Sequence, residues 1–200
     1  MDADQNKIVT TATNAAVVGS VSYISWANNL TDNSGNITIA LPSENGGQPI
    51  TFQVNGFLSD KENEYTITGV NNTGQIGIFS TPSGKVGTIN IGLNSYEILP
   101  LGKSKGLIYK KSPAGFQNEG NCGQSLMSPE ENPSDYCEGN CGNDVIDILF
   151  MVAPEASQWL NDHYGAYRWL VLLGEGQKFN MALQNSEITG KKARFKIRFV

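Results

Sequence analysis

The middle of the chain, residues 21–110, is a succession of short stretches in which apolar and polar side chains alternate. Residues 50–54 and 86–91 show the period of two that is typical of a strand with one buried face. Gly, Asn, Asp and Pro cluster between the stretches, where tight turns need such residues. The stretches are 21–26, 37–41, 50–57, 65–70, 76–79, 86–91, 96–101 and 107–110. This spacing predicts an antiparallel β-sandwich or open barrel over residues 21–110.

Composition sets the broad class of the protein. The 200 residues are 39% hydrophobic and 16% charged, which is enough apolar material for a folded core in one large or two small domains. The net charge of −5 argues against a nucleic-acid partner, because such proteins present basic surfaces. No run of about 18 apolar residues occurs, so we expect no membrane span.

Two segments lack the strand pattern. Residues 1–20 are small and polar with no amphipathic period, and we expect a leader or a loose N-terminus there. Residues 111–144 contain Pro113, Pro129 and Pro133 together with all three cysteines, and nothing in this segment alternates. We interpret residues 111–144 as a linker.

The last part of the chain, residues 145–200, has a third pattern. Residues 145–152 form an almost continuous apolar run, which suits a buried strand. Pro154 and Glu155 suit the first turn of a helix, and a helical period then continues to about Asn185. Glycines at 165, 174 and 176 indicate interruptions or two helices. Residues 193–200 alternate strictly, so the segment predicts a β–α–β unit that begins an α/β domain, and the fold class is α+β.

A β–α–β unit of about 55 residues does not cover its own sheet. It therefore either packs against the β-rich part or belongs to a polypeptide that continues past Val200, and we favour the second arrangement.

Motifs for catalysis are missing from the sequence. His163 is the single histidine, so no H-E-x-x-H zinc motif occurs, and no serine has a G-x-S-x-G context. We expect His163 to be either a helix-surface residue or a satisfied polar residue, and we assign no catalytic residue to the chain. Five cations, Lys191, Lys192, Arg194, Lys196 and Arg198, alternate with apolar residues and predict a solvated strand face. The acidic residues Glu130, Glu131, Asp135 and Glu138 lack calcium-loop spacing and are interpreted as part of a solvated linker.

The cysteines carry the most distinctive chemistry of the chain. A thiolate can fill the coordination position that a catalytic zinc reserves for water, so Cys122 is a candidate inhibitory zinc ligand. The alternative is a disulfide within residues 122–141, for which Cys137 and Cys141 are candidates, with the remaining cysteine paired elsewhere.

Three stretches resemble one protein family. Residues 145–156 resemble the opening strand and helix start of the catalytic domain of secreted bacterial reprolysin-like metzincins, which are zinc metalloproteases. Residues 179–188 resemble the end of the first long helix of that domain, and residues 194–200 fit its second strand. Residues 87–101, with Gly-x-Ile and Tyr-x-Ile strands, resemble the prodomains of these proteases.

The resemblance implies a protease precursor: a prodomain over residues 21–110, then a linker and the first elements of the peptidase. Such a prodomain acts as an intramolecular inhibitor and folding aid whose partner is the protein's own C-terminal peptidase domain, which would act on peptide or protein substrates. No zinc ligand of the family lies within the chain; zinc is expected in the full-length protein, downstream of Val200. Lys110 and Lys111 are candidates for the activation cleavage, and the resemblance implies a secreted or cell-surface bacterial protein.

Two other classes of function remain open from the residues. One is a non-enzymatic, secreted β-sandwich module for binding or adhesion. The other is a carbohydrate-binding domain, which would need an exposed aromatic face formed by residues such as Trp26, Tyr65 and Tyr96.

Overall fold

A computed structural model describes residues 1–27, 29–42, 47, 49–61, 63–112, 145–185 and 192–199. The first part comprises α1 (Ala3–Ala15), β1 (Ala16–Ser25), β2 (Asn36–Ala40), β3 (Pro49–Lys61), β4 (Glu64–Val70), β5 (Gly74–Thr81), β6 (Gly84–Ile91), β7 (Asn94–Pro100) and β8 (Lys105–Lys111). The second part comprises β9 (Val145–Val152), α2 (Pro154–Tyr164), the 3₁₀ turn η3 (Gly165–Tyr167), α3 (Arg168–Asn185) and β10 (Lys192–Phe199).

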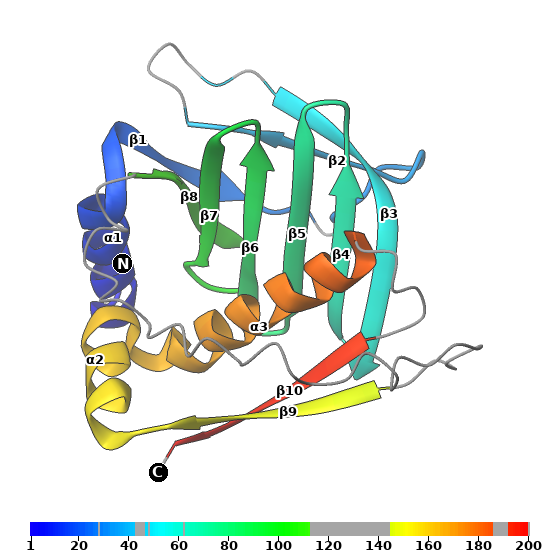
Figure 1. Cartoon of the computed structure of the whole chain (residues 1–200). Coiled ribbons are helices and arrows are strands. Elements are labelled where there is room, and N and C mark those ends of the chain that lie inside the picture. Colours follow the sequence, from blue (N-terminus) through cyan, green and yellow to red (C-terminus); the bar gives the residue numbers. More distant parts are fainter. Residues whose placement is uncertain are drawn as a thin grey trace, which may run out of the picture.

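The strands of the first part form one antiparallel sheet of eight strands in the order β1-β8-β7-β6-β5-β4-β3-β2. Successive hairpins connect β2 to β8, and β1 pairs with β8 at the opposite edge. The sheet is a half-barrel, because side chains of both edge strands enter the same core as those of the central strands. The antiparallel architecture predicted from the alternation is therefore confirmed (Figure 1).

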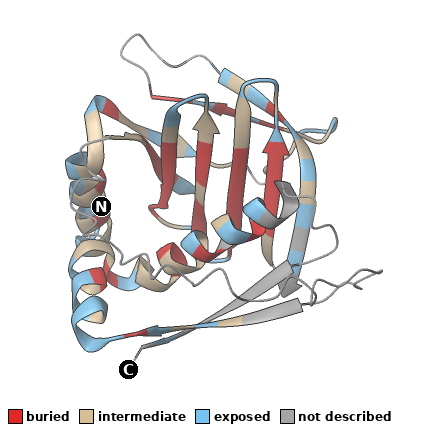
Figure 2. Ribbon diagram, in the orientation of Figure 1, coloured by how far each residue is buried: buried red, intermediate tan, exposed pale blue. Residues whose placement is uncertain are grey.

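The sheet has an enclosed face and an outer face. The enclosed core contains Ile76, Ile78, Ile89 and Ile98, all fully buried, with Phe52 from β3. Buried residues are concentrated in the central strands (Figure 2). Tyr96 lies in this core and Trp26 and Tyr65 pack against it, so these three residues do not form the exposed aromatic face that a carbohydrate-binding domain would need.

The N-terminal segment differs from our expectation of a loose end, since residues 3–15 form helix α1. Asp2 and Gln5 form a reciprocal capping box at its start, and Ile8 and Ala12 are fully buried against β7 and β8. Only one narrow stripe of α1 is apolar, which is why the sequence pattern did not reveal the helix.

The predicted strand–helix–strand order of residues 145–199 is present. β9 and β10 pair in parallel and form a sheet separate from the eight-stranded one (Figure 1). Gly165 ends α2 with a positive φ of 55°, and a Cβ there would lie 2.0 Å from Oδ1 of Asp4, so the two expected helices meet at a residue that must be glycine. Within the described ranges, no helix is both long and apolar enough to cross a membrane.

Helix α3 lies across the outer face of β5 and β6 (Figure 1). The helical layer thus docks on the β-rich part, which is the arrangement that we did not favour from the sequence. α1 takes part in this docking, because the Lys7 ammonium and the Thr11 hydroxyl donate hydrogen bonds of 3.0 Å to the carbonyl groups of Asn161 and His163 in α2.

Candidate functional site

At the docking surface, the backbone of α3 lies close to strand β6 of the sheet. Leu170 of α3 is fully buried and packs with Phe79 of β5 and Val86 of β6. One helical turn further, a Cβ on Gly174 would lie 2.5 Å from Cγ2 of Val86. Gly174 therefore allows α3 to pack closely on the sheet, because any larger side chain there would push the helix away from β6.

We predict that Gly174→Ala weakens this contact. The added methyl group overlaps Val86, so we expect a loss of about 1–3 kcal/mol in the free energy of unfolding, although alanine favours helices over glycine. Urea denaturation measures the loss. Adding Val86→Ala should restore part of it, because the shorter residue makes room for the methyl group, and failure of this rescue would contradict the assigned contact.

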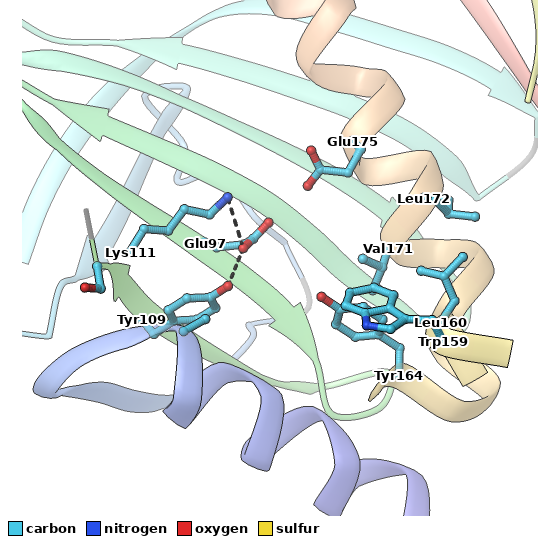
Figure 3. Close-up of a pocket in the computed structure, with 11 residues that line it drawn as sticks. Glu97, Tyr109, Lys111, Trp159, Leu160, Tyr164, Val171, Leu172 and Glu175 are labelled. Carbon is cyan, nitrogen blue, oxygen red and sulfur yellow. Dashed lines mark hydrogen bonds and ion pairs between the residues drawn. The ribbon is translucent and has the colours of Figure 1, made fainter. Parts of the chain in front are cut away.

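Next to this contact, a cluster of charged and aromatic side chains joins the sheet to α3. Glu97 of β7 is 9% exposed and accepts a hydrogen bond from the Tyr109 hydroxyl of β8. Its carboxylate lies 3.3 Å from the ammonium of Lys111 and 3.6 Å from that of Lys178. Lys178 belongs to α3 and also pairs with Glu175 one turn earlier. We call Glu97, Tyr109, Lys111, Glu175 and Lys178 the interface cluster. Figure 3 shows its members other than Lys178.

The two carboxyl groups of the cluster are shifted in opposite directions. Burial raises the pKa of Glu97, but Lys111, Lys178 and the Tyr109 hydroxyl outweigh burial and leave that pKa below its ordinary value. Burial raises the pKa of Glu175, and the charge of Glu97 adds to the rise against the opposing effect of Lys178. The Glu175 side chain is 47% exposed, so solvent screens part of this rise in pKa.

The tyrosines beside these carboxylates stay protonated over the physiological range. Burial, followed by the charge of Glu97, raises the pKa of Tyr109. Burial raises the pKa of Tyr164, in α2, to about 12, with Glu97 and Glu175 adding to the shift. Both hydroxyl groups therefore remain neutral near pH 7.

A cavity of about 360 Å³ lies beside the cluster, between β7, β8 and the helices. Trp159 and Tyr164 of α2 form its aromatic wall, and Val171 and Leu172 of α3 form an aliphatic wall (Figure 3). Glu97 and Lys111 supply the polar side. Both carboxylate oxygens of Glu97 already have partners within the chain, which is typical of an ionic contact that holds two elements together.

Only some of the predicted site residues belong to the part of the chain that the structure describes. Cys122, Cys137 and Cys141 and the acidic residues at 130, 131, 135 and 138 lie outside the described residues. Among the residues that are described, no group of three or more His, Cys, Asp or Glu side chains could hold a metal ion. Lys110 and Lys111 lie in β8, paired with Tyr96 and Ala16. Strand pairing protects a peptide bond from proteases, so the backbone at these two lysines is a poor cleavage site in this conformation.

Two surface predictions can be followed in the structure. His163 lies on α2, where its ring stacks on Trp159 at 4.1 Å between centroids and Nδ1 is 2.7 Å from the Trp159 carbonyl oxygen. The prediction of a satisfied polar residue is confirmed. Arg198 is exposed, as expected for the solvated strand face.

The sequence did not reveal the interface cluster as a site. A signal was present at Glu97, which is the one charged residue in the apolar stretch 96–101. A charge in such a run indicates a buried partner elsewhere in the chain. Lys178, the partner of Glu97 on α3, lies 81 positions further along the sequence, too far for a local pattern to link the two.

Comparison with known proteins adds no assignment, since no protein-family model matches the chain and no curated protein is significantly similar to it.

Proposed function

We propose that this chain is the N-terminal portion of a secreted zinc metalloprotease zymogen of the reprolysin-like metzincin kind. In this proposal, residues 21–110 are an inhibitory and folding prodomain, residues 111–144 are a linker, and residues 145–200 are the first elements of the peptidase. The observation that carries the proposal is the docking of α3, the helix that the resemblance assigns to the peptidase, on the outer face of the sheet through Leu170, Gly174 and Lys178.

The proposed role of the prodomain follows from tethering. A segment of the same chain has a high effective concentration, so modest contacts are enough to keep the prodomain on the peptidase. Cutting the chain between residues 112 and 145 would remove this advantage. The sheet would then hold α3 only through the contacts described above, and the prodomain could dissociate.

Latency itself is proposed to involve zinc in the full-length protein. Cys122 is the candidate thiolate ligand that would fill the position of the attacking water. Cys137 and Cys141 are the candidates for a disulfide. The chain itself contributes no catalytic residue to this proposal.

The first test is the coding sequence beyond Val200. An H-E-x-x-H motif within about the next hundred codons, the spacing expected for a peptidase domain that follows its first strands, supports the precursor. An immediate stop codon favours the alternative, a secreted binding or adhesion module.

The second test uses the full-length precursor. Cys122→Ser should lower the latent fraction in a peptidase assay, whereas Cys137→Ser, as the matched cysteine control, should leave the zinc-bound thiolate in place. An unchanged latent fraction in the Cys122→Ser protein rejects the role of Cys122. Limited proteolysis should cut within residues 113–144 before it cuts the strands.

A further inference from the structure

The cavity beside the interface cluster is bordered by both layers of the structure. Strands β7 and β8 of the sheet form one side, and helices α2 and α3 form the other (Figure 3). Its volume of about 360 Å³ falls within the range of roughly 300–1,000 Å³ that is usual for small-molecule sites. An apolar cavity of about 150 Å³ already holds benzene, so this cavity has room for a ring that carries a short substituent.

The walls of the cavity are apolar and suit a flat ring. Trp159 and Tyr164 meet nearly edge to face, with 6.1 Å between ring centroids and 70° between ring planes, so they form two sides of a corner. Val171 and Leu172 form the aliphatic wall. His163 stacks on one face of the Trp159 indole, and Trp159 still keeps 52% of its surface exposed. Aromatic surface is therefore accessible to a ligand, next to aliphatic surface that a ring can also contact.

The charges on the polar side of the cavity are matched. Lys111 pairs with Glu97, and Lys178 pairs with both Glu97 and Glu175. Two carboxylate groups thus face two ammonium groups, and the interface cluster carries no net charge. A charged ligand would disturb this balance and would lose its own hydration on entering, whereas an uncharged polar group does neither.

One polar group of the cavity is left to bind a ligand. The Tyr164 hydroxyl makes no hydrogen bond within the part of the chain that the structure describes, and Figure 3 shows it on the side of the ring that faces Tyr109. Burial raises the pKa of Tyr164 to about 12, so this hydroxyl is neutral and can donate. Glu175 also lines the cavity, and its carboxylate, 47% exposed, can accept a further hydrogen bond. A ligand hydroxyl suits both groups, because it can accept from a phenol and donate to a carboxylate.

We propose that this cavity binds a small uncharged molecule that has an apolar ring and a hydroxyl group, such as an aromatic alcohol. The ring lies between the corner of Trp159 and Tyr164 and the aliphatic wall of α3, and the hydroxyl group lies at the polar side. Because both layers line the cavity, the bound molecule contacts the sheet and the helices together and holds α3 on the sheet. The binding does not depend on the proposed function, whereas its consequence, a strengthened latency, rests on that function.

The experiment titrates the 200-residue chain at pH 7 with three probes that share a phenyl ring and differ in charge. The probes are phenethyl alcohol, which is uncharged, phenethylamine, which is a cation at this pH, and phenylacetate, which is an anion. NMR shifts of the backbone amides report binding, at probe concentrations up to about 10 mM because ligands of this size bind near the millimolar range.

Phenethyl alcohol should shift amides of α2, α3 and β7, and it should bind at least about fivefold more tightly than either charged probe. The indole N–H of Trp26, which packs against the enclosed core, should not shift. Equal or tighter binding of a charged probe, or no shift with any of the three, overturns the proposal.

Two variants separate recognition of the hydroxyl group from recognition of the ring. Tyr164→Phe keeps the aromatic ring and removes the donor, so the affinity for phenethyl alcohol should fall by about fivefold. Trp159→Leu removes part of the aromatic corner at a half-exposed position and should weaken all three probes by a similar factor. Tyr23→Phe is the matched control, because Tyr23 is an exposed tyrosine of β1 outside this cavity, and its affinity should equal that of the wild type. Unchanged affinity in Tyr164→Phe or in Trp159→Leu overturns the proposal.

Hydrogen exchange of the α3 amides tests the effect of the ligand on docking. Phenethyl alcohol that binds only the docked state should slow this exchange by up to the factor 1 + [L]/Kd, which is about elevenfold at ten times Kd. Tyr164→Phe should show less slowing at the same concentration. Binding without slower exchange in α3 would mean that the probe does not hold the two layers together, contrary to the proposal.

The inference and the proposed function fail separately. Probe binding is measured on the 200-residue chain, so a stop codon directly after Val200 would reject the protease precursor and leave the binding result unaffected. An H-E-x-x-H motif beyond Val200 together with no probe binding would support the precursor and reject the ligand site.

Discussion

Replacing Leu170 by alanine is expected to lower the free energy of unfolding by about 2–5 kcal/mol. Leu170 has no exposed surface, and it packs with Phe79 and Val86 on the outer face of the sheet. Truncation removes apolar contacts and leaves a cavity at the centre of the docking surface. Because Gly174 holds the helix close to β6, α3 has little room to move and fill that cavity. Urea denaturation followed by tryptophan fluorescence measures the change.

Leu93→Ala provides the matched control for this prediction. Leu93 lies in the turn between β6 and β7 and is fully exposed, with a relative exposure of 105%, so its truncation should change stability by less than about 0.5 kcal/mol. A Leu170→Ala protein as stable as Leu93→Ala would mean that α3 does not dock on the sheet in solution. That result would also remove the main support for the proposed prodomain.

The strands could be predicted from the sequence because one face of the sheet is uniformly apolar. Ile76, Ile78 and Ile89 lie on the enclosed face, and such residues produce the alternation of apolar and polar side chains that is visible in the sequence. The alternation over residues 86–91 indicated one buried face only, with Thr88 on the opposite, polar face. In the structure Thr88 is buried too, and Val86 on the same face packs against Leu170 of α3. Polarity patterns alone do not reveal that a helix covers this second face.

The helices and the interface cluster were harder to predict from the sequence, because contacts between distant residues determine them. α1 was missed because Ile8 and Ala12 gain their burial from β7, β8 and α3, all distant in the sequence. The break between α2 and α3 was foreseen from Gly165, whereas Gly174 lies inside α3 and serves packing against Val86. The interface cluster joins residues 97, 109, 111, 175 and 178, and no local pattern pairs them. Local periodicity therefore predicts elements, while their pairing across the fold comes from the structure.

The second large effect is expected at Glu97. We predict that Glu97→Ala lowers the free energy of unfolding by about 3 kcal/mol, near the lower limit for breaking a buried ion pair. The substitution leaves the Tyr109 hydroxyl without its acceptor. It also removes the carboxylate that the ammonium groups of Lys111 and Lys178 both contact, so their two positive charges are no longer compensated by Glu97. These lysines are 23% and 32% exposed, so solvent relieves part of the cost, which is why the value lies at the lower end. Urea denaturation at pH 6 measures it, with the exposed Glu155→Ala as control.

A double-substitution cycle tests whether the loss at Glu97 comes from the ion pair rather than from packing. If Glu97 and Lys111 act together, Glu97→Ala and Lys111→Met combined should cost less than the sum of the single changes, because neither charge is then left without the other. Additive losses would assign the effect of Glu97 to Lys178 and Tyr109 instead. Lys111→Met should also raise the pKa of Glu97, since Lys111 is the largest of the effects that lower it, and this shift can be followed by NMR titration of the carboxyl group. The cycle thus separates the part of the cluster that stabilises the sheet, through β7 and β8, from the part that holds α3.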